Sequence, residues 1–430
     1  MKYETSAAAL TALNAFAPPD YCGPELERIN HINFELTAIF AEAGFSPIEP
    51  AILQPADILF DLYGEEIWDR SFVIEDIEHG AWCLRPDFTA PVARSYLASV
   101  QAGSEVGAPA RYGYFGPVFR RARGAGDGAL QQLQAGVEII GEPEVAERDA
   151  EVFDLARRAL EWAGCKRYQV VLGDLGLIFG VLDAVPMPDS WRTRLRRRFW
   201  RPERFNALLR RLSGGPAAQH ADSRVAFLKG LGSLGPEEAE RAVEEMMALA
   251  ETPQIGVRSA AEVAERFLRQ AEDAQAHPLP SESAALIEAA AGVTGSAADA
   301  LTTFETLARD ARVDLSAQCA LYAQRLDALS ARGVEPNDLT FDAVFGRDLA
   351  YYDGFVFEMR PPPDPADPSG AHTLGRLGGG GRYDRLFTAL GAPRPVQGVG
   401  AALKPEAILA AAAREQAQTD QRAPQREEKP

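Results

Sequence analysis

The sequence predicts an α+β protein in which helices flank an antiparallel sheet and a helical insertion divides the strand-forming segments. Residues 1 to about 180 mix glycine, proline and aromatic residues with short strand-like runs. Residues 185–335 are rich in Ala, Leu, Glu and Arg at helical spacing, and strand-like runs return from Phe341. A helical block between two strand-rich segments is typical of a domain inserted into a mixed sheet. The expected parts are a core in two segments, an insertion and a polar, disordered tail, at 1–180 and 336–412, 185–335 and 413–430.

Local patterns predict the elements of the first segment in order. Apolar residues recur at helical spacing over 23–44 and predict a helix that ends at Gly44. The next segment, 45–53, contains Pro47 and Pro50, so we expect an edge or interface strand. Further strands are predicted at Ser71–Ile74, Ala81–Leu84, Arg111–Arg120, Leu130–Ile140 and Tyr168–Leu172. Two helices are predicted between them, from Thr89 to Val100 and from Glu144 to Gly164.

Composition argues against several classes of protein. The 430 residues include 44 Lys and Arg against 62 Asp and Glu, a formal charge of −18. Because nucleic-acid binders need a basic surface, we expect no nucleic-acid partner. The four cysteines form no CxxC pair and the five histidines no HxxH pair, so we expect neither a metal site nor a disulfide framework. No leader pattern and no long apolar run is present, which predicts a cytoplasmic protein without membrane contact.

The predicted strand over 130–140 carries an unusual pattern of side chains. Its alternation places Gln132, Gln134, Gly136 and Glu138 on one face and apolar residues on the other. A solvated face explains this pattern as well as a binding face does. The preceding strand, however, ends in a group of arginines, Arg120, Arg121 and Arg123. Arginines beside carboxylates and amides suit a small zwitterionic ligand, because guanidinium binds its carboxylate and Asp or Glu its ammonium.

Five segments, in this order, resemble the class II histidyl-tRNA synthetases. The helix ending at Gly44, followed by Pro50, is similar to the dimer-forming motif 1 of that family. The other four segments are Leu-Arg-Pro-Asp-Phe-Thr-Ala at 84–90, motif 2 at 114–120 with 134–138, and two histidine-specific segments at 347–358 and 380–384. The resemblance implies a class II aminoacyl-tRNA synthetase-like antiparallel sheet, flanked by helices and carrying a helical insertion.

The resemblance also implies a binding site for free histidine. Asp87 stands where the family has a glutamate that binds the α-ammonium of histidine, with Thr89 and Gln134 beside it. Asp in place of Glu shortens the reach by one methylene but keeps the charge. Arg120 and Arg347 stand where the family's arginines contact the α-carboxylate of histidine or the α-phosphate of ATP.

The imidazole end of the implied site consists of Glu138, Tyr352 and Tyr383. A glutamate accepts a hydrogen bond from a ring N–H, and a tyrosine hydroxyl serves either ring nitrogen, so this set distinguishes histidine from other amino acids. Tyr351 is included in the predicted histidine-binding set as the neighbour of Tyr352, and packing in the core is its alternative role.

The sequence departs from the synthetase pattern at the adenine end of the site. The motif 2 glutamate that helps to hold adenine is Ala122, and the final Glu-Arg of motif 3 is Lys404-Pro405. Proline offers neither a guanidinium plane nor a donor. Only about 25 residues follow, too few for the family's anticodon-binding domain. The histidine half of the site is therefore expected to be kept and the ATP half to be damaged.

These features together resemble the regulatory subunits of ATP phosphoribosyltransferase. The resemblance implies a non-catalytic chain without a cofactor, which pairs with a short-form ATP phosphoribosyltransferase catalytic subunit in a hetero-oligomer built on a homodimer. It further implies a role in the first step of histidine biosynthesis and in feedback inhibition by L-histidine. Two alternatives stay open: a truncated ligase that activates histidine with ATP, and a pure assembly scaffold with a relic pocket.

Three further patterns each have a structural and a functional interpretation. The Arg-rich segment Trp191–Arg201 either docks an acidic partner or forms a solvated helix whose apolar stripe packs against its own domain, and the stripe favours packing. Asp174 is expected to cap the helix that follows it rather than to bind a ligand. The Gly-rich stretch at 378–381 is as consistent with a tight turn as with a ligand cradle.

Overall fold

The computed structural model describes residues 20–56, 70–76, 80–121, 130–199, 201–214, 278–345, 351–362 and 375–422, and single residues at 238, 241, 242 and 245. The chain divides into two compact units. The first contains residues 1–177, 293–305 and 316–430, and the second contains 178–292 and 306–315. The Arg347, Ala122 and Arg123 positions singled out from the sequence lie outside the described residues.

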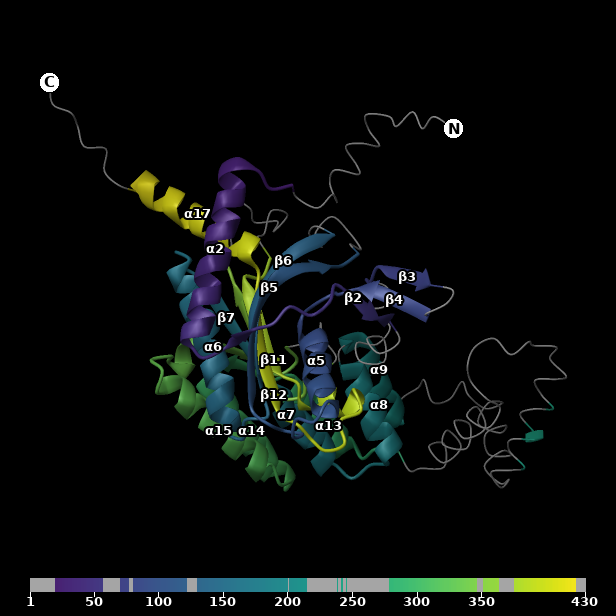
Figure 1. Ribbon diagram of the computed structural model, residues 1–430. Helices are drawn as coiled ribbons and strands as arrows, with labels where there is room; N and C mark the ends of the chain where they lie inside the picture. The colour runs from purple at the N-terminus through teal and green to yellow at the C-terminus, as the bar shows by residue number, and fades with distance from the viewer. Residues whose placement is uncertain are drawn as a thin grey trace, which may run out of the picture. The chain divides into compact units, whose positions relative to one another are not determined.

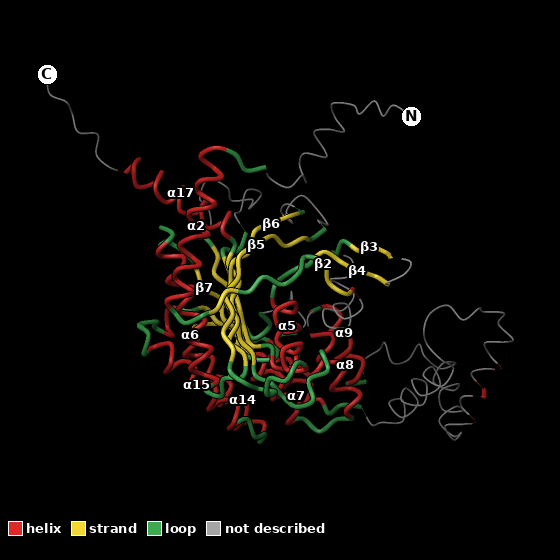
Figure 2. Tube along the Cα trace, in the orientation of Figure 1, coloured by secondary structure: helices red, strands yellow, loops and turns green. Residues whose placement is uncertain are grey.

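A nine-stranded sheet forms the centre of the first unit (Figures 1 and 2). In spatial order its strands are β1 (Ser46–Pro47), β5 (Ala110–Phe119), β6 (Gln131–Ile140), β12 (Gly398–Leu403), β11 (Gly378–Arg382), β10 (Phe355–Arg360), β7 (Gln169–Asp174), β9 (Thr340–Asp342) and β8 (Thr294–Ser296). Every pair from β5 to β7 is antiparallel, as predicted. The proline-containing β1 pairs only with β5, in parallel, at the sheet edge where such a strand is tolerated.

A smaller sheet and several helices complete the first unit. The small sheet has the order β2 (Leu53–Pro55), β4 (Gly80–Leu84) and β3 (Val73–Asp76). The helices are α2 (Gly23–Glu42), α5 (Thr89–Gln101), α6 (Val145–Trp162), α15 (Ser316–Ser330), α16 (Asp384–Ala389) and α17 (Pro405–Arg422), with a 3₁₀ turn at Pro336–Asp338. Figure 2 shows α2, α6 and α15 on one side of the large sheet and α5 on the other.

The described residues of the second unit form mostly helices. The unit contains most of α7 (Leu175–Ala184), then α8 (Asp189–Phe199), α9 (Pro202–Leu212) and α13 (Ser281–Ala291), while α14 (Ala297–Ala311) begins in the first unit. Trp191, Leu195 and Phe199 of α8 are buried, and the Phe199 ring meets Phe179 and Phe205 edge-on at 5.6 and 5.7 Å. The packing interpretation of the Arg-rich segment is therefore confirmed.

The structure corrects two of the predicted boundaries. The tail at 413–430 was expected to be disordered, but α17 continues to Arg422. Glu415 accepts hydrogen bonds from the backbone N–H groups of Lys166 and Arg167 at 3.1 and 2.8 Å, contacts that anchor the polar helix and that composition does not reveal. In addition, α15 belongs to the first unit instead of the 185–335 insertion, because it packs on α6.

Candidate functional site

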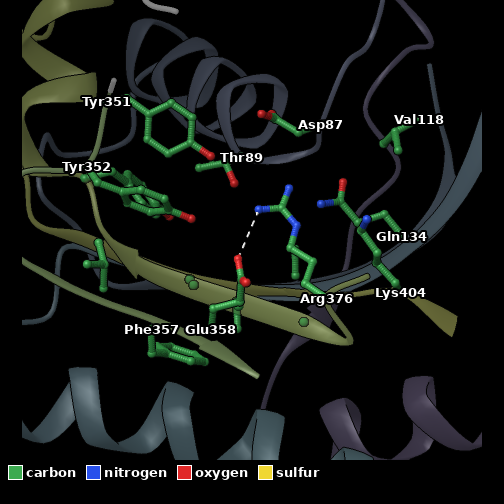
Figure 3. A pocket seen from close by; sticks show the side chains of 18 of the residues that line it. Asp87, Thr89, Val118, Gln134, Tyr351, Tyr352, Phe357, Glu358, Arg376 and Lys404 are labelled. Atoms are coloured by element: carbon green, nitrogen blue, oxygen red, sulfur yellow. Dashed lines mark ion pairs between the residues drawn. The ribbon is translucent and has the colours of Figure 1, made fainter. Parts of the chain in front are cut away.

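A pocket of about 290 Å³ opens on the face of the large sheet that α5 covers (Figure 3). Strands β6, β10, β11 and β12 contribute to its walls, together with the segments at Asp87–Thr89 and Tyr351–Tyr352. The Gly-rich stretch is part of strand β11, so it is neither a turn nor a loop cradle. A Cβ atom at Gly380 would lie 2.1 Å from the carbonyl oxygen of Gly400, so glycine lets the two strands approach closely at the pocket.

The structure brings together most of the residues predicted to bind histidine. Seven of the nine line the pocket: Asp87, Thr89, Arg120, Gln134, Tyr351, Tyr352 and Tyr383. Glu138 lies directly behind Thr89 and Tyr383, and Arg347 lies outside the described residues. Tyr351 is buried as well as pocket-lining, which bears out its packing role and leaves its binding role a prediction. That these residues bind histidine stays a prediction.

Arg85 holds the segment that carries Asp87 and Thr89. It is fully buried, and its guanidinium donates to the carbonyl oxygens of Pro50 at 2.6 Å and Pro117 at 2.8 Å. The guanidinium also lies 4.0 Å from the centre of the Phe88 ring. One arginine thus ties three sequence motifs together, a positioning role that the sequence did not reveal.

Glu138 accepts hydrogen bonds from three buried hydroxyl groups. Tyr383 Oη lies 2.5 Å from Glu138 Oε2, and Thr89 Oγ1 and Tyr114 Oη lie 2.8 and 3.4 Å from Oε1. Burial raises the pKa of Glu138 to about 8, although the hydroxyl donors oppose that shift. Gly400 leaves the space for this carboxyl, because a Cβ atom there would lie 1.6 Å from Oε2.

The ammonium end of the predicted site carries acceptors. Asp87 is buried and lines the same pocket as Arg120, and its negative charge opposes the lowering of the Arg120 pKa by burial. The Gln134 Oε1 atom is buried without a hydrogen-bond partner among the described residues. A buried acceptor without a partner costs free energy unless a ligand or water donates to it. This end of the pocket can therefore accept hydrogen bonds from a bound ammonium group.

The pocket also contains cations on the side of Gln134, which the sequence does not mark as site residues. Arg376 and Lys404 line it, and the Arg376 Nη1 atom lies 3.6 Å from Glu358 Oε2 (Figure 3). The same carboxylate pairs with Arg360. The signal available in the sequence was Lys404 itself, a cation where motif 3 has an anion.

The remaining charged residues of the Gly-Gly-Arg-Tyr-Asp segment have a structural role. Arg382 leaves the sheet on the side opposite Tyr383 and donates to Asp149 on α6 at 2.6 Å. Arg325 of α15 bridges Asp149 at 2.7 Å and Asp174 at 2.5 Å. Asp174 also accepts from the Gly176 N–H at 2.9 Å, which confirms its role as a helix cap. These four residues, Asp149, Asp174, Arg325 and Arg382, are called the core ion-pair cluster below.

Comparisons with known proteins show the family to which the chain belongs. A family model described as histidyl-tRNA synthetase matches residues 19–275 and 263–408. The chain is 35% identical over 356 residues to the ATP phosphoribosyltransferase regulatory subunit of Brucella anthropi, covering 82% of this chain and 89% of that protein. The chain belongs to the ATP phosphoribosyltransferase regulatory subunit family. The protein of that name from Brucella canis is also 35% identical, over 86% of this chain and 93% of its own length.

Solved structures of this histidyl-tRNA synthetase-like family support the fold. An ATP phosphoribosyltransferase regulatory subunit/histidyl-tRNA synthetase from Bacillus halodurans C matches 92% of this chain and 82% of its own, with a TM-score of 0.60 and 20% identity. A histidine–tRNA ligase subunit from Alicyclobacillus acidocaldarius matches 93% and 97%, with a TM-score of 0.55 and 23% identity. The predicted class II synthetase-like fold is confirmed.

The described residues contain neither a metal-binding cluster nor a membrane-spanning helix. No group of three or more His, Cys, Asp or Glu side chains within the described ranges is arranged to hold a metal ion. Among the helices described, none combines the length and the apolar character that crossing a membrane requires. The four cysteines are free thiols, and three of them are buried.

Proposed function

We propose that this chain is a cytoplasmic, non-catalytic subunit that binds free L-histidine and regulates a short-form ATP phosphoribosyltransferase catalytic subunit. The observation that carries the proposal is the buried Glu138 carboxyl, which accepts hydrogen bonds from the hydroxyl groups of Thr89 and Tyr383. These two residues line a pocket that also contains Asp87 and Gln134. This set matches a zwitterion whose side chain has hydrogen-bonding ring nitrogens. The proposed complex makes the first intermediate of histidine biosynthesis and is inhibited by the end product.

The imidazole of histidine would occupy the tyrosine end of the pocket. Its ring N–H would replace one hydroxyl donor at Glu138, and the Tyr352 hydroxyl would serve the second ring nitrogen. Burial raises the pKa of Tyr352 and of Tyr383 above the ordinary value for tyrosine. Their hydroxyl groups therefore stay protonated and can donate hydrogen bonds. The α-ammonium would then meet the acceptors of Asp87 and Gln134.

Inhibition requires that histidine bind one state of the complex better than the other. A ligand shifts an equilibrium only by the difference between its affinities for the two states, and the coupling is reciprocal. Histidine would therefore bind more tightly to the low-activity arrangement. Conversely, substrates of the catalytic subunit would weaken the binding of histidine to this chain by the same factor.

Self-association through α2 is part of the proposal. Phe34 of this helix is 70% exposed and Leu26 is 41% exposed, although the helix buries an apolar face against the sheet. A second copy covering this outer face would remove both side chains from water. Phe34→Glu is expected to shift the dimer towards monomer in light scattering, whereas Arg309→Gln, an exposed change elsewhere, is expected to leave it intact.

Two variants test the histidine site. We expect calorimetry to show selective binding of L-histidine, with Glu138→Gln and Tyr352→Phe each weakening it by about 1–3 kcal/mol, the cost of one unmet buried polar contact. Both variants should still co-purify with the catalytic chain and restore its activity, but with reduced inhibition by histidine. Binding without selectivity over other amino acids would exclude the sensor. Unchanged inhibition in both variants would favour the pure scaffold.

One observation favours the ligase alternative: Arg120 lines the pocket and is available to contact a phosphate. Against it, Pro405 stands at the start of α17 and cannot supply the motif 3 guanidinium. Histidine-dependent exchange of pyrophosphate into ATP decides between the two functions. We expect no exchange, and exchange that Arg120→Gln abolishes would establish the enzyme instead.

A further inference from the structure

The Glu406 carboxylate lies where three parts of the first unit meet. Glu406 stands in the first turn of α17, one residue after the proline that starts the helix. Its Oε1 atom accepts a hydrogen bond from the Tyr21 hydroxyl at 2.9 Å and another from the Leu133 backbone N–H at 2.8 Å. Tyr21 leads into α2, and Leu133 belongs to β6. One side-chain oxygen of α17 thus joins the segment before α2 to a strand of the large sheet.

The bond to Leu133 completes the sheet at the point where β12 ends. The last residue pair between β12 and β6 is Leu403 with Ala135, and in the same register Pro405 would stand opposite Leu133. The chain turns into α17 at Pro405, so its backbone no longer follows β6 there. A strand N–H that is shielded from water and left without an acceptor costs free energy. The Glu406 side chain supplies the acceptor that the departing strand does not.

The same joint is part of the pocket wall. Leu133 and its neighbours Gln132 and Gln134 line the pocket, and so does Lys404, which lies two residues before Glu406. The Oε1 atom of Gln134 is the buried acceptor that has no hydrogen-bond partner among the described residues. A ligand that donates to Gln134 would therefore act on β6 one residue away from the N–H group that Glu406 holds.

The bond to Tyr21 reaches the helix proposed for self-association. The N-cap residue of α2, Cys22, makes no side-chain capping hydrogen bond, so the Tyr21 hydroxyl provides a polar tie at this end of the helix. Burial and the negative charge of Glu406 raise the pKa of Tyr21, which keeps its hydroxyl protonated as the donor. Helix α17 also lies against α2 (Figure 1). The exposed side chains of Leu26 and Phe34 belong to this same helix.

We propose that Glu406 is a positioning residue that couples ligand binding in the pocket to self-association through α2. The inference rests on the proposed function, because it takes L-histidine as the ligand and α2 as the contact between two copies. A ligand that shifts β6 at Gln134 changes the geometry at the shared Oε1 atom, so the Tyr21 hydroxyl must follow or lose its bond. Because linkage is reciprocal, self-association would change the affinity for L-histidine by the same factor.

Sedimentation equilibrium on the full chain, with and without saturating L-histidine, tests the coupling. We expect histidine to change the dimer dissociation constant of the native chain at least about fivefold. Tyr21→Phe and Glu406→Ala should reduce this change to less than about twofold, whereas Glu406→Gln keeps an acceptor oxygen and should preserve it. Tyr168→Phe is the matched control, because the Tyr168 hydroxyl donates to Glu161 at 3.0 Å and neither residue lines the pocket. Circular dichroism verifies that each variant is folded.

Two outcomes would overturn the coupling. The first is a dimer dissociation constant that L-histidine leaves unchanged although the native chain binds it. The second is an equal effect of histidine in the native chain, Tyr21→Phe and Glu406→Ala, or loss of the effect in Tyr168→Phe as well. A chain that binds no L-histidine or stays monomeric would refute the proposed function instead, and amide hydrogen exchange then decides the link. Faster exchange at Leu133 in Tyr21→Phe would support it, and equal or slower exchange would overturn it.

Discussion

Two groups of buried charges lie in the first unit, and they differ in balance. In the core ion-pair cluster, Asp149 sits between Arg325 and Arg382 at 2.7 and 2.6 Å, and Asp174 completes the pairing. In the pocket, Arg376 pairs with Glu358, but Lys404, near Arg120 and Arg376, has no ion pair to any described residue. Arg382 of the first group, and Arg120 and Lys404 of the second, lie in segments that the sequence marks as motifs.

The difference teaches how to separate structural charge from functional charge. Buried charges that neutralise one another hold the strands and helices together and need no ligand. A buried cation without an ion pair imposes a cost on the protein even where carboxylates lie elsewhere in the same pocket. Balance between neighbours, and not burial or motif membership, therefore distinguishes the two groups.

The largest expected effect comes from breaking the balanced group. Arg325→Leu would leave Asp149 and Asp174 buried with too little positive charge, so we expect unfolding in urea to show a loss of about 3–5 kcal/mol. The exposed pair of Arg309 with Asp310 gives the control, because Arg309→Gln should change stability by less than about 0.5 kcal/mol. A loss below about 1 kcal/mol in Arg325→Leu would show that the cluster is not a structural unit.

Glu138 sharpens the comparison through pH. Its pKa is about 8 in the folded chain, above the ordinary carboxyl value, so the folded state binds more protons than the unfolded state between those two pKa values. The contribution to stability is therefore present at low pH and is lost as pH rises towards 8, by roughly 2–4 kcal/mol. Glu138→Gln should remove this part of the slope in thermal unfolding from pH 5 to 8. Parallel slopes in both proteins would contradict the buried, protonated carboxyl.

Gly400→Ala tests whether the space beside Glu138 is required. The added Cβ atom would fall 1.6 Å from Glu138 Oε2, so the carboxyl must move away from Thr89 and Tyr383. We expect a loss of about 1–3 kcal/mol in urea unfolding and loss of histidine binding by calorimetry. Gly295→Ala has no atom within 4 Å but a φ of +142°, so it shows the backbone effect alone and should leave histidine binding unchanged. Equal histidine affinity in Gly400→Ala and the native chain would remove Glu138 from the site.

The smallest expected effect concerns Lys404. Its pKa of about 7 reflects burial and the charges of Arg376 and Arg120, opposed by Glu358 and Glu406. Lys404→Gln removes a repelled cation, so urea unfolding at pH 6 should show no loss, or a gain of up to about 1 kcal/mol. A loss of more than about 1 kcal/mol in Lys404→Gln at pH 6 would show that this cation stabilises the fold instead.

Much of the fold and most of the candidate site follow from local pattern in the sequence. The alternation of polar and apolar residues along 130–140 predicted β6, and the helical spacing of apolar residues over 23–44 predicted α2. Both elements have nearly the predicted bounds. Seven of the nine predicted histidine-binding residues line one pocket. Each of them lies in a sequence motif, and the pairing of the strands brings these motifs together. Family membership likewise depends on ordered motifs, which the one-dimensional sequence carries in full.

Only the tertiary structure decided which charges neutralise one another. Arg382 and Tyr383 are adjacent in the sequence. Arg382 completes the core ion-pair cluster, whereas Tyr383 donates a hydrogen bond to Glu138. Arg376 and Lys404 are 28 positions apart and become neighbours through the pairing of β11 with β12. Electrostatic energy depends on distances between side chains, and those distances are set by strand register and helix packing and not by local spacing.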